Sequence, residues 1–299
     1  DITDMGYQIS NNWLFLGSQN GLKFSDYDES SIFLSNEIEV GYSFEGNADL
    51  DTSSQSTYLS YKSSFRNTSN IEFTNFYRTP SKDFWITRGN LISPYIKKPK
   101  NYGTKLQFMG PSTDFFKYIL EIKREKGSQW SFSALGFKTS YMAMADFTPR
   151  DNLSLSLMYQ RSKEDDWLNW IEDNLLGIYK QKQRTTIASM NWFGGDKHEL
   201  RMKAQMVAFT ARQPGAYLGD ATGSLNPIEM ALPPFSLSDL AFQVRYRYEI
   251  MPLAYLYVVY SKGGRIVELD EEDSLGELYK RPWNDPQADN FTVKVRYRF

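Results

Sequence analysis

Hydrophobic and polar side chains alternate with a period of two along most of this chain. The C-terminal segment shows this pattern best, because Phe291, Val293 and Val295 alternate with Thr292 and Lys294. Successive side chains of a β-strand point to opposite faces of its sheet, so this spacing predicts a strand with one apolar and one polar face. We therefore expect an all-β fold.

The same alternation recurs along the chain and predicts fourteen strands. They are expected at residues 13–24, 34–45, 55–65, 69–78, 83–90, 102–109, 115–124, 130–147, 152–161, 184–193, 197–208, 239–250, 253–261 and 289–299. The segment 130–147 changes phase midway, which indicates a bulge or a turn within it. No linker or low-complexity tract interrupts the pattern, so residues 1–299 are expected to form a single domain.

The connections between these predicted strands alternate in length. The short ones are 79–82, 110–114, 148–151, 194–196 and 251–252, and the longest are 162–183, 209–238 and 262–288. Short turns at one rim and long loops at the other are typical of outer-membrane barrels. The sequence therefore predicts a transmembrane antiparallel up-and-down β-barrel of about 14 strands, or 16 if more strands belong to it.

A soluble β-sandwich also alternates apolar and polar residues, so the content of the two faces must distinguish it from a barrel. Aromatic residues make up 16% of the chain, and many Tyr and Trp fall on the apolar faces, as suits a membrane interface. The polar faces carry paired charges, which suit a wet lumen. No run of about 18 uncharged apolar residues occurs, so no transmembrane helix is expected. A soluble all-β protein remains the alternative.

The C-terminus resembles the signal that barrel-assembly machinery recognises in outer-membrane proteins. An aromatic final residue preceded by apolar residues at every second position carries this resemblance, in Val293, Val295, Tyr297 and Phe299. In hydrocarbon an unpaired backbone group costs several kcal/mol, so a membrane sheet must close. The first strand must then pair with 289–299, or with strands that precede it in a longer protein.

Two stretches resemble a known family. They run from Asn191 to Gln205, around the turn 194–196, and from Leu240 to Tyr260, around the turn 251–252. Both are similar to the C-terminal barrel of the DUF5916 proteins of Gram-negative bacteria, over about residues 184–262. The resemblance implies an outer-membrane barrel that normally follows a carbohydrate-binding family 9-like domain. That domain is absent here, so the chain is expected to be a fragment of a longer protein.

Composition excludes several classes of function. Lys+Arg is 34 and Asp+Glu is 36, and this near balance argues against a nucleic-acid partner. Zero cysteines exclude disulfides, thiolate zinc sites and cysteine nucleophiles. The single histidine, His198, disfavours His-based metal sites and catalytic triads. We expect no cofactor.

Three features of the sequence are candidates for a catalytic, cation-binding or interfacial role. His198 follows the turn 194–196, at the expected periplasmic rim, where an interfacial polar role competes with that of a general base. An acidic run in the loop 262–288 is either solvated or binds a divalent cation; its residues are Glu268, Asp270, Glu271, Glu272 and Asp273, with Glu277 behind. The segment 165–176 has Trp167, Leu168, Ile171 and Leu175 at helical spacing, which predicts a short helix in the loop.

The polar faces are expected to line the lumen. The cationic and acidic residues assigned to it are Arg201, Lys203, Arg245, Arg247, Glu249, Lys294, Arg296, Arg298, Glu37, Glu39 and Glu45. The cations would form one wall of the lumen, on the C-terminal strands. The three N-terminal glutamates would lie on the neighbouring wall, beyond the seam where the first strand pairs with 289–299. Opposed rows of charge either orient a polar solute across the pore or neutralise each other in a blocked interior.

These inferences predict a non-enzymatic outer-membrane barrel that acts as a porin-like pore, a translocation conduit or a membrane anchor for a partner. Expected partners are outer-membrane lipid and lipopolysaccharide, the barrel-assembly machinery and another envelope protein. The alternatives are a barrel hydrolase, which the single histidine disfavours, and a soluble carbohydrate-binding β protein.

Overall fold

The computed structural model describes residues 14–46, 53–84, 86–127, 135–269 and 274–297. Strands dominate it. They are β1 (Leu14–Phe24), β2 (Phe33–Gly46), β3 (Ser53–Phe65), β4 (Asn70–Arg78), β5 (Ser81–Asp83), β6 (Ile96–Lys98), β7 (Asn101–Met109), β8 (Phe116–Lys126), β9 (Phe137–Arg150), β10 (Leu153–Glu172), β11 (Leu175–Gly194), β12 (His198–Gly219), β13 (Leu225–Ile228), β14 (Phe235–Met251), β15 (Ala254–Leu269) and β16 (Ala288–Arg296). The helix α1 (Leu275–Asn284) lies between β15 and β16.

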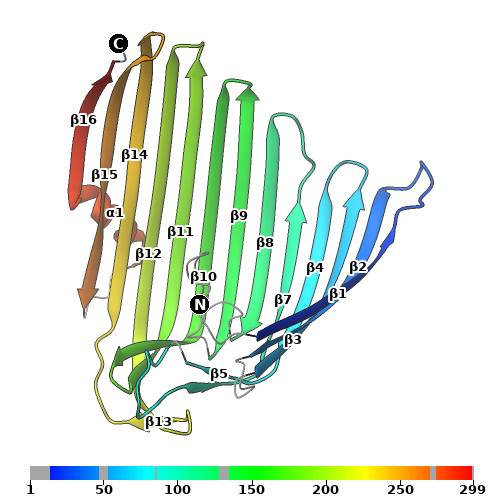
Figure 1. Ribbon diagram of the computed structural model, residues 1–299, viewed down its shortest axis with the longest axis vertical. Coiled ribbons are helices and arrows are strands. Elements are labelled where there is room, and N and C mark those ends of the chain that lie inside the picture. The colour runs from blue at the N-terminus through cyan, green and yellow to red at the C-terminus, as the bar shows by residue number, and fades with distance from the viewer. Residues whose placement is uncertain (1–13, 47–52, 85, 128–134, 270–273, 298–299) are drawn as a thin grey trace.

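Thirteen of these strands form one antiparallel meander, in the order β1-β2-β3-β4-β7-β8-β9-β10-β11-β12-β14-β15-β16 (Figure 1). Each strand of this meander pairs with the next strand of the meander, with β5, β6 and β13 left out, so the predicted up-and-down order is confirmed for the described strands. The short strand β13 pairs with the end of β12, and β5 and β6 form a separate two-stranded sheet. The predicted strands are confirmed where the structure describes them, except 83–90; residues 130–134 of the predicted strand 130–147 lie outside the described residues.

The sheet has one continuous apolar face. Directly opposed residues of antiparallel strands lie on the same face, as Val40 and Leu59 do in one row of partners and Leu157, Ala145 and Tyr118 do in another. The side chains of this face are exposed in the isolated chain: Leu59 is 47% exposed, Leu157 51% and Val293 55%. The face is uncovered over most strands, as no second sheet of described residues packs on it.

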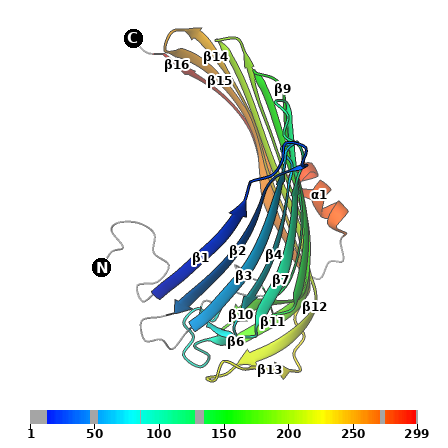
Figure 2. The ribbon, with the colours of Figure 1, turned by 90° about the vertical axis from the view of Figure 1, so that its right-hand side faces the viewer.

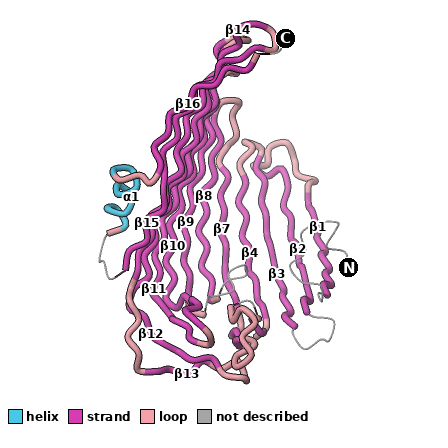
Figure 3. The backbone as a smooth tube through the Cα atoms, turned by 60° about the vertical axis from the view of Figure 1, so that its left-hand side comes forward, coloured by secondary structure: helices cyan, strands magenta, loops and turns pink. Residues whose placement is uncertain are grey.

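The sheet is strongly curved and open. Figure 2 shows it edge-on as a trough, and Figure 3 shows the strands twisting from β1 round to β16. The helix α1 lies on the convex side, where its Trp283 packs edge-on against Phe242 of the apolar face. The convex face is therefore the apolar one, and the opposite, concave face carries most of the polar side chains.

The two edge strands run in the same direction. Each pairs with one neighbour among the described residues, β1 with β2 and β16 with β15. In an antiparallel meander of thirteen strands the first and last are parallel to one another. Thirteen described strands lie in the meander, against about 14 expected, because Ser81–Asp83, the part of 81–90 that is described as strand, pairs with β6 and not with the large sheet.

Most connections at one rim are short, and most of those at the other are longer, except for the two-residue turn between β10 and β11 (Figure 1). The turns 151–152, 195–197 and 252–253 follow the prediction closely. The connection 79–82 does not belong to this rim; the turn between β3 and β4, at 66–69, takes its place. Arg88 and Gly89 adopt positive φ angles of 51° and 77°, which break the expected strand at 83–90 into a turn.

The segment 165–176 is part of a long hairpin, so the predicted helix is wrong. Strands β10 and β11 are 20 residues each and meet at the turn Asp173–Asn174. Register shifts between Glu164 and Trp167, and between Trp170 and Glu172, insert extra residues into β10. Such bulges break the period of two, which explains the helix-like spacing of the apolar residues there. The predicted long loops 162–183 and 209–238 are largely strand for the same reason.

Buried apolar side chains gather at the long-loop rim. One cluster joins Ile96, Leu168 and Leu176 at 0–1% exposure. On the concave side, Trp167 packs edge-on against Phe209 with ring centroids 5.2 Å apart, next to Tyr179. Among the described residues, no helix reaches the length and apolarity of a membrane-crossing helix. The middle of the sheet thus has two solvent-accessible faces and no shared core.

Candidate functional site on the polar face

The concave face of the sheet, called the polar face below, holds most of the ionic and hydrogen-bonding side chains. Its residues follow from the strand register, because the partners of a polar-face residue on both neighbouring strands share that face. One such row runs from Glu39 of β2 through Ser60 of β3 to Thr74 of β4 and Lys105 of β7. The alternation read from the sequence places all of them on the side opposite the exposed apolar residues.

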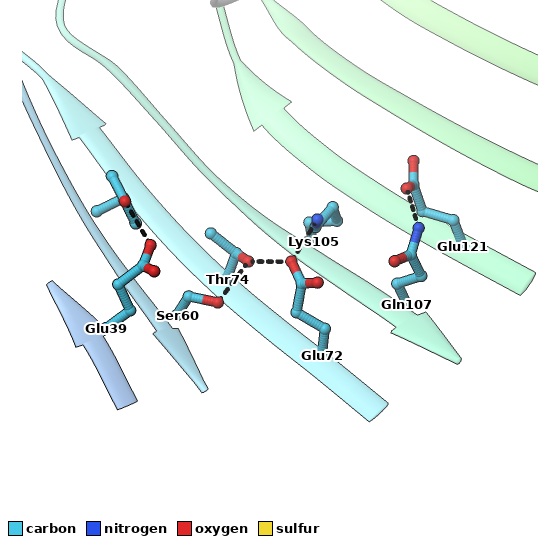
Figure 4. Close-up of polar contacts among 8 residues, drawn as sticks. Glu39, Ser60, Glu72, Thr74, Lys105, Gln107 and Glu121 are labelled. Carbon is cyan, nitrogen blue, oxygen red and sulfur yellow. Dashed lines mark hydrogen bonds and ion pairs between the residues drawn. The ribbon is translucent and has the colours of Figure 1, made fainter. Parts of the chain in front are cut away.

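Hydrogen bonds connect Ser60 of this row with Thr74 and Lys105 across β3, β4 and β7, and a separate bond holds Glu39 (Figure 4). Ser60 and Thr74 share a hydrogen bond of 3.3 Å, and the Thr74 hydroxyl donates to Glu72 over 3.1 Å. The same Glu72 oxygen accepts from Lys105 Nζ at 2.6 Å. Tyr58 donates its hydroxyl to Glu39, one strand away. The network stiffens a wall in which each acid has a partner.

Charges balance on the polar face of β1 to β9. Cations and carboxylates occur there in equal number, the cations being Lys23, Lys62, Arg78, Lys105, Lys117, Lys123 and Lys138 and the carboxylates Glu37, Glu39, Glu45, Glu72, Glu121, Glu125 and Asp146. Several form direct pairs: Lys123 lies 3.0 Å from Glu125, and Arg78 lies 3.6 Å from Glu45. Gln107 donates to Glu121 over 3.3 Å. This half compensates its own charge.

The polar face of β12, β14 and β16 has an excess of positive charge. We call this region the C-terminal cationic wall, which consists of Arg201, Lys203, Arg245, Arg247, Lys294 and Arg296. The carboxylates on the polar face of these three strands are Glu199, Glu249 and Asp239, and Asp239 pairs with Arg265 of β15 at 2.7 Å. The wall therefore carries more cations than its acids can neutralise.

Glu199 is the centre of this wall. Its residue exposure is 2%, and three guanidinium groups surround it: Arg201 forms an ion pair with it, Arg247 lies 2.9 Å away and Arg245 3.6 Å away. A buried carboxylate needs such partners, since an unpaired buried charge is strongly unfavourable. The partners themselves are 36–45% exposed, so they face the concave space. Glu199 was missed from the sequence, although its neighbours Arg201 and Lys203 were assigned.

The remaining cations of the wall are not neutralised locally. Lys203, Lys294 and Arg296 form no ion pair with any residue that the structure describes. Lys294 and Arg296 are exposed on the edge strand β16. These positions can attract an anion that approaches the concave face.

The residues assigned to the lumen share the polar face, but the two charged rows are not brought together. Glu37, Glu39 and Glu45 lie on β2, near one edge of the open sheet, and the cationic wall lies near the other (Figure 1). Their local partners differ from the expected ones: Glu39 accepts from Tyr58 and Glu45 pairs with Arg78. Arg298 lies outside the described residues.

His198 lies on the apolar face beside the turn 195–197. Its Nδ1 is 2.6 Å from the Tyr246 hydroxyl, and its ring packs on Tyr248 with centroids 4.9 Å apart. No serine or carboxylate among the described residues hydrogen-bonds to its ring. Two tyrosines of β14 therefore form the surroundings of the His198 ring.

The acidic run lies partly outside the described residues, which leave out 270–273. Glu268 pairs with Arg281 of α1, and Glu277 accepts a hydrogen bond from the backbone N–H of Ser274 at 2.8 Å. This bond holds the pKa of the Glu277 carboxyl below its usual range. No group of three or more His, Cys, Asp or Glu side chains within the described ranges could hold a metal ion.

A tight turn after β12 is a polar cluster that the sequence did not reveal. Asp220 accepts hydrogen bonds from the hydroxyl of Thr222 at 2.7 Å and from the amide of Asn226 at 2.9 Å. These donors, the Thr222 hydroxyl above all, hold the pKa of Asp220 well below its usual range. The cluster orders the turn that leads into β13.

The residues of the predicted assembly signal point to the convex side. Val293, Val295 and Tyr297 are 55%, 60% and 50% exposed, and Phe291 of the same face is 69% exposed. Phe299 is not among the described residues. The apolar side of β16 therefore faces outward and does not pack into a protein interior.

Comparison with known proteins adds little. No model of a protein family matches the chain, and no curated protein matches it, so the resemblance to the DUF5916 proteins is neither supported nor refuted. Among solved structures, the NanC porin in a rhombohedral crystal form is similar, with 8% identity and a TM-score of 0.25 over 95% of this chain and 99% of that one.

Proposed function

We propose that this chain forms most of a non-enzymatic outer-membrane β-barrel. The observation that carries the proposal is the exposed apolar face, which continues from β1 to β16 and is uncovered over most of its area. Soluble monomers rarely expose apolar patches above a few hundred Å², and larger ones mark a protein or membrane contact. A bilayer covers all thirteen strands at once, as a protein partner of ordinary size does not.

Strand lengths fit this placement. A tilted transmembrane strand needs about 9–11 residues. β4 and β7 have 9 residues each, while β10, β11 and β12 have 20, 20 and 22. The long strands therefore extend past the membrane on the side of the long loops, where the buried clusters around Leu168 and Trp167 give them a protein core.

Closure of the barrel needs an odd number of further strands. β1 and β16 are parallel, so pairing them directly gives a parallel seam, whereas bacterial barrels of this type have an even number of antiparallel strands. If β16 paired with β1 of a second copy in the same membrane orientation, these two strands would also be parallel. One or three more strands, contributed by residues outside the described ones, make all the seams antiparallel and give 14 or 16 in total.

Within this barrel the polar face lines the lumen, and the protein acts as a pore, a translocation conduit or an anchor for an envelope partner. The resemblance to the DUF5916 proteins supports an anchoring role beside the pore. The cation excess of the C-terminal wall favours the passage of anions. Outer-membrane lipid, lipopolysaccharide and the barrel-assembly machinery are the proposed partners.

Two measurements test the barrel. Heat-modifiable migration in SDS gels, together with a requirement for detergent, is the expected behaviour of the purified protein. A water-soluble monomer that migrates identically before and after boiling would contradict the proposal. Conductance in planar bilayers then separates an open pore from a plugged anchor.

Ion selectivity tests the role of the polar face. We expect the reversal potential in a salt gradient to shift toward cation preference in the variant Lys203→Glu/Lys294→Glu. Neither lysine pairs with a described acid, so the folded barrel should survive the change. Lys23→Glu, on the compensated half, is the control and should shift the potential less. Equal shifts would show that the wall has no special role.

A further inference from the structure

Four cations form a square on the apolar face of β10 and β11. Arg161 lies directly opposite Arg184, and Lys163 lies directly opposite Lys182. We call these four residues the basic block. Directly opposed side chains have Cβ atoms about 5 Å apart, and like charges in such pairs are destabilising. Two such pairs in succession concentrate positive charge that an anion would stabilise.

The described residues neutralise little of this charge. Lys163 pairs with Asp165 at 2.9 Å, at an exposed position. Arg184 lies over the ring of Tyr279, 5.5 Å from its centroid, and its Nε is buried without a hydrogen-bond partner. Arg161 and Lys182 are exposed and form no ion pair within the described part of the chain.

A cavity opens beside the basic block. It measures about 390 Å³ and is lined by Arg161, Lys182, Arg184, Thr210, Arg212 and the start of α1 at Ser274–Gly276. The helix begins there with a complete capping box between Ser274 and Glu277. A helix N-terminus adds positive potential, which reinforces the attraction for an anion already set by the cations. The helix thus closes one side of a cationic cavity.

An apolar groove begins next to this cavity on the same face. Tyr159 precedes Arg161 by two residues on β10 and lies opposite Ala143 of β9. The small Ala143 side chain leaves a groove of about 390 Å³ between Tyr159, Tyr141, Leu120 and Leu106. Its walls are almost entirely apolar. A cationic cavity and an apolar groove in sequence match a molecule with an anionic head and a hydrocarbon chain.

We propose that this site binds the phosphate group of a membrane lipid, with an acyl chain of the same lipid in the groove over Ala143. The inference rests on the proposed function, because the apolar face must meet lipid for the site to be reached. Guanidinium groups suit phosphate, since they donate several hydrogen bonds in a fixed plane. The position, at the boundary between the apolar and polar parts of the outer surface, is where lipid headgroups lie.

Native mass spectrometry of the detergent-solubilised protein tests the site, with diphosphorylated lipid A, its dephosphorylated form and inorganic phosphate as separate probes. We expect binding of the diphosphorylated lipid only. The variant Arg161→Gln/Lys182→Gln should bind it roughly thirtyfold more weakly, about fivefold for each cation removed. Neither residue contacts α1 through a ring or a hydrogen bond, so the helix should remain docked.

The control variant is Arg124→Gln/Lys126→Gln, which removes the same charge from the same face on β8. It should bind diphosphorylated lipid A as the wild type does. If it loses as much affinity as Arg161→Gln/Lys182→Gln, general electrostatic attraction explains the binding and the proposal is overturned. Equal binding of the dephosphorylated lipid, or of inorganic phosphate alone, would also overturn it. Absence of binding by the wild type would overturn it as well.

Heat-modifiable migration separates this inference from the proposed function. A wild-type protein that migrates as a folded barrel but binds lipid A no better than the double variant would overturn the lipid site and leave the barrel intact. A protein that shows no barrel behaviour would overturn both.

Discussion

The two halves of the sheet share one apolar face and differ in their polar face. From β1 to β9, acids and cations are equal in number and pair across neighbouring strands, as Glu72 does with Lys105 at 2.6 Å. From β12 to β16, three arginines surround the single buried carboxylate of Glu199 and three further cations have no described acid partner. The apolar face that both halves share indicates that the same medium surrounds both. The difference between their polar faces indicates that the C-terminal half is the specialised one.

The C-terminal half, counted from β10 to β16, also carries structure that the N-terminal half, β1 to β9, lacks. Its strands β10 to β12 reach 20–22 residues, and α1 packs on its outer side. The basic block and its cavity lie at this junction. Specialisation on both faces of the same half suggests that the first strands complete the wall while the later ones hold the binding surfaces.

The largest expected effect tests the apolar face that the two halves share. Leu59→Arg in the N-terminal half and Leu157→Arg in the C-terminal half should each lower the free energy of unfolding in lipid vesicles by about 2–4 kcal/mol, the cost of a charge facing lipid near the bilayer centre. Unfolding in guanidinium chloride measures it. Ser156→Arg, on the polar face next to Leu157, should change it little. A large loss for one leucine alone would break the equivalence of the two halves.

The second prediction tests the difference between the polar faces of the two halves. Glu199→Gln leaves three guanidinium groups around a neutral side chain, and we expect a loss of about 2 kcal/mol of unfolding free energy after allowing for the solvent exposure of the arginines. Glu72→Gln removes one partner from a pair that is about a quarter exposed, with an expected loss of about 0.5 kcal/mol. Equal losses in the same assay would show that burial of Glu199 does not set the two halves apart.

A smaller, local effect concerns α1. Ser274→Ala removes the N-cap hydroxyl that accepts the backbone N–H of Glu277 at 3.2 Å, at an expected cost of about 1 kcal/mol to the helix. Faster hydrogen exchange confined to α1 is the expected readout. The lowered pKa of Glu277 means that its contribution is present above the ordinary glutamate pKa and is lost as pH falls through the lowered value. Exchange in α1 of the wild type that is unchanged on acidification would contradict this role.

Period-two alternation was enough to predict the faces of the sheet. Phe291, Val293 and Val295 lie on the outer face as expected, because a one-residue slip in register would move each of them to the other side. The predicted helix at 165–176 failed because two bulges in β10 imitate helical spacing. The helix α1 was missed, although Ser274 and Glu277 have the spacing of a capping box.

The candidate sites depended on pairing that the sequence does not contain. Arg201, Arg245 and Arg247 were assigned to one face, but their shared partner Glu199 emerged only when β12 and β14 were placed side by side. In the same way, Arg161 and Arg184 are 23 positions apart along the chain and become opposed only through the register of β10 and β11. The expected contact between the cations and Glu37, Glu39 and Glu45 requires a closed barrel, which thirteen strands do not form.

The most direct test of the membrane-facing assignment is site-directed spin labelling along β10 in lipid vesicles. The chain has no native cysteine, so single cysteines at Ser154, Leu155, Ser156 and Leu157 label unique positions. We predict that labels at Leu155 and Leu157 collide mainly with oxygen dissolved in the bilayer, and that labels at Ser154 and Ser156 collide mainly with a water-soluble nickel complex. Equal access of the nickel complex to all four positions would contradict the account.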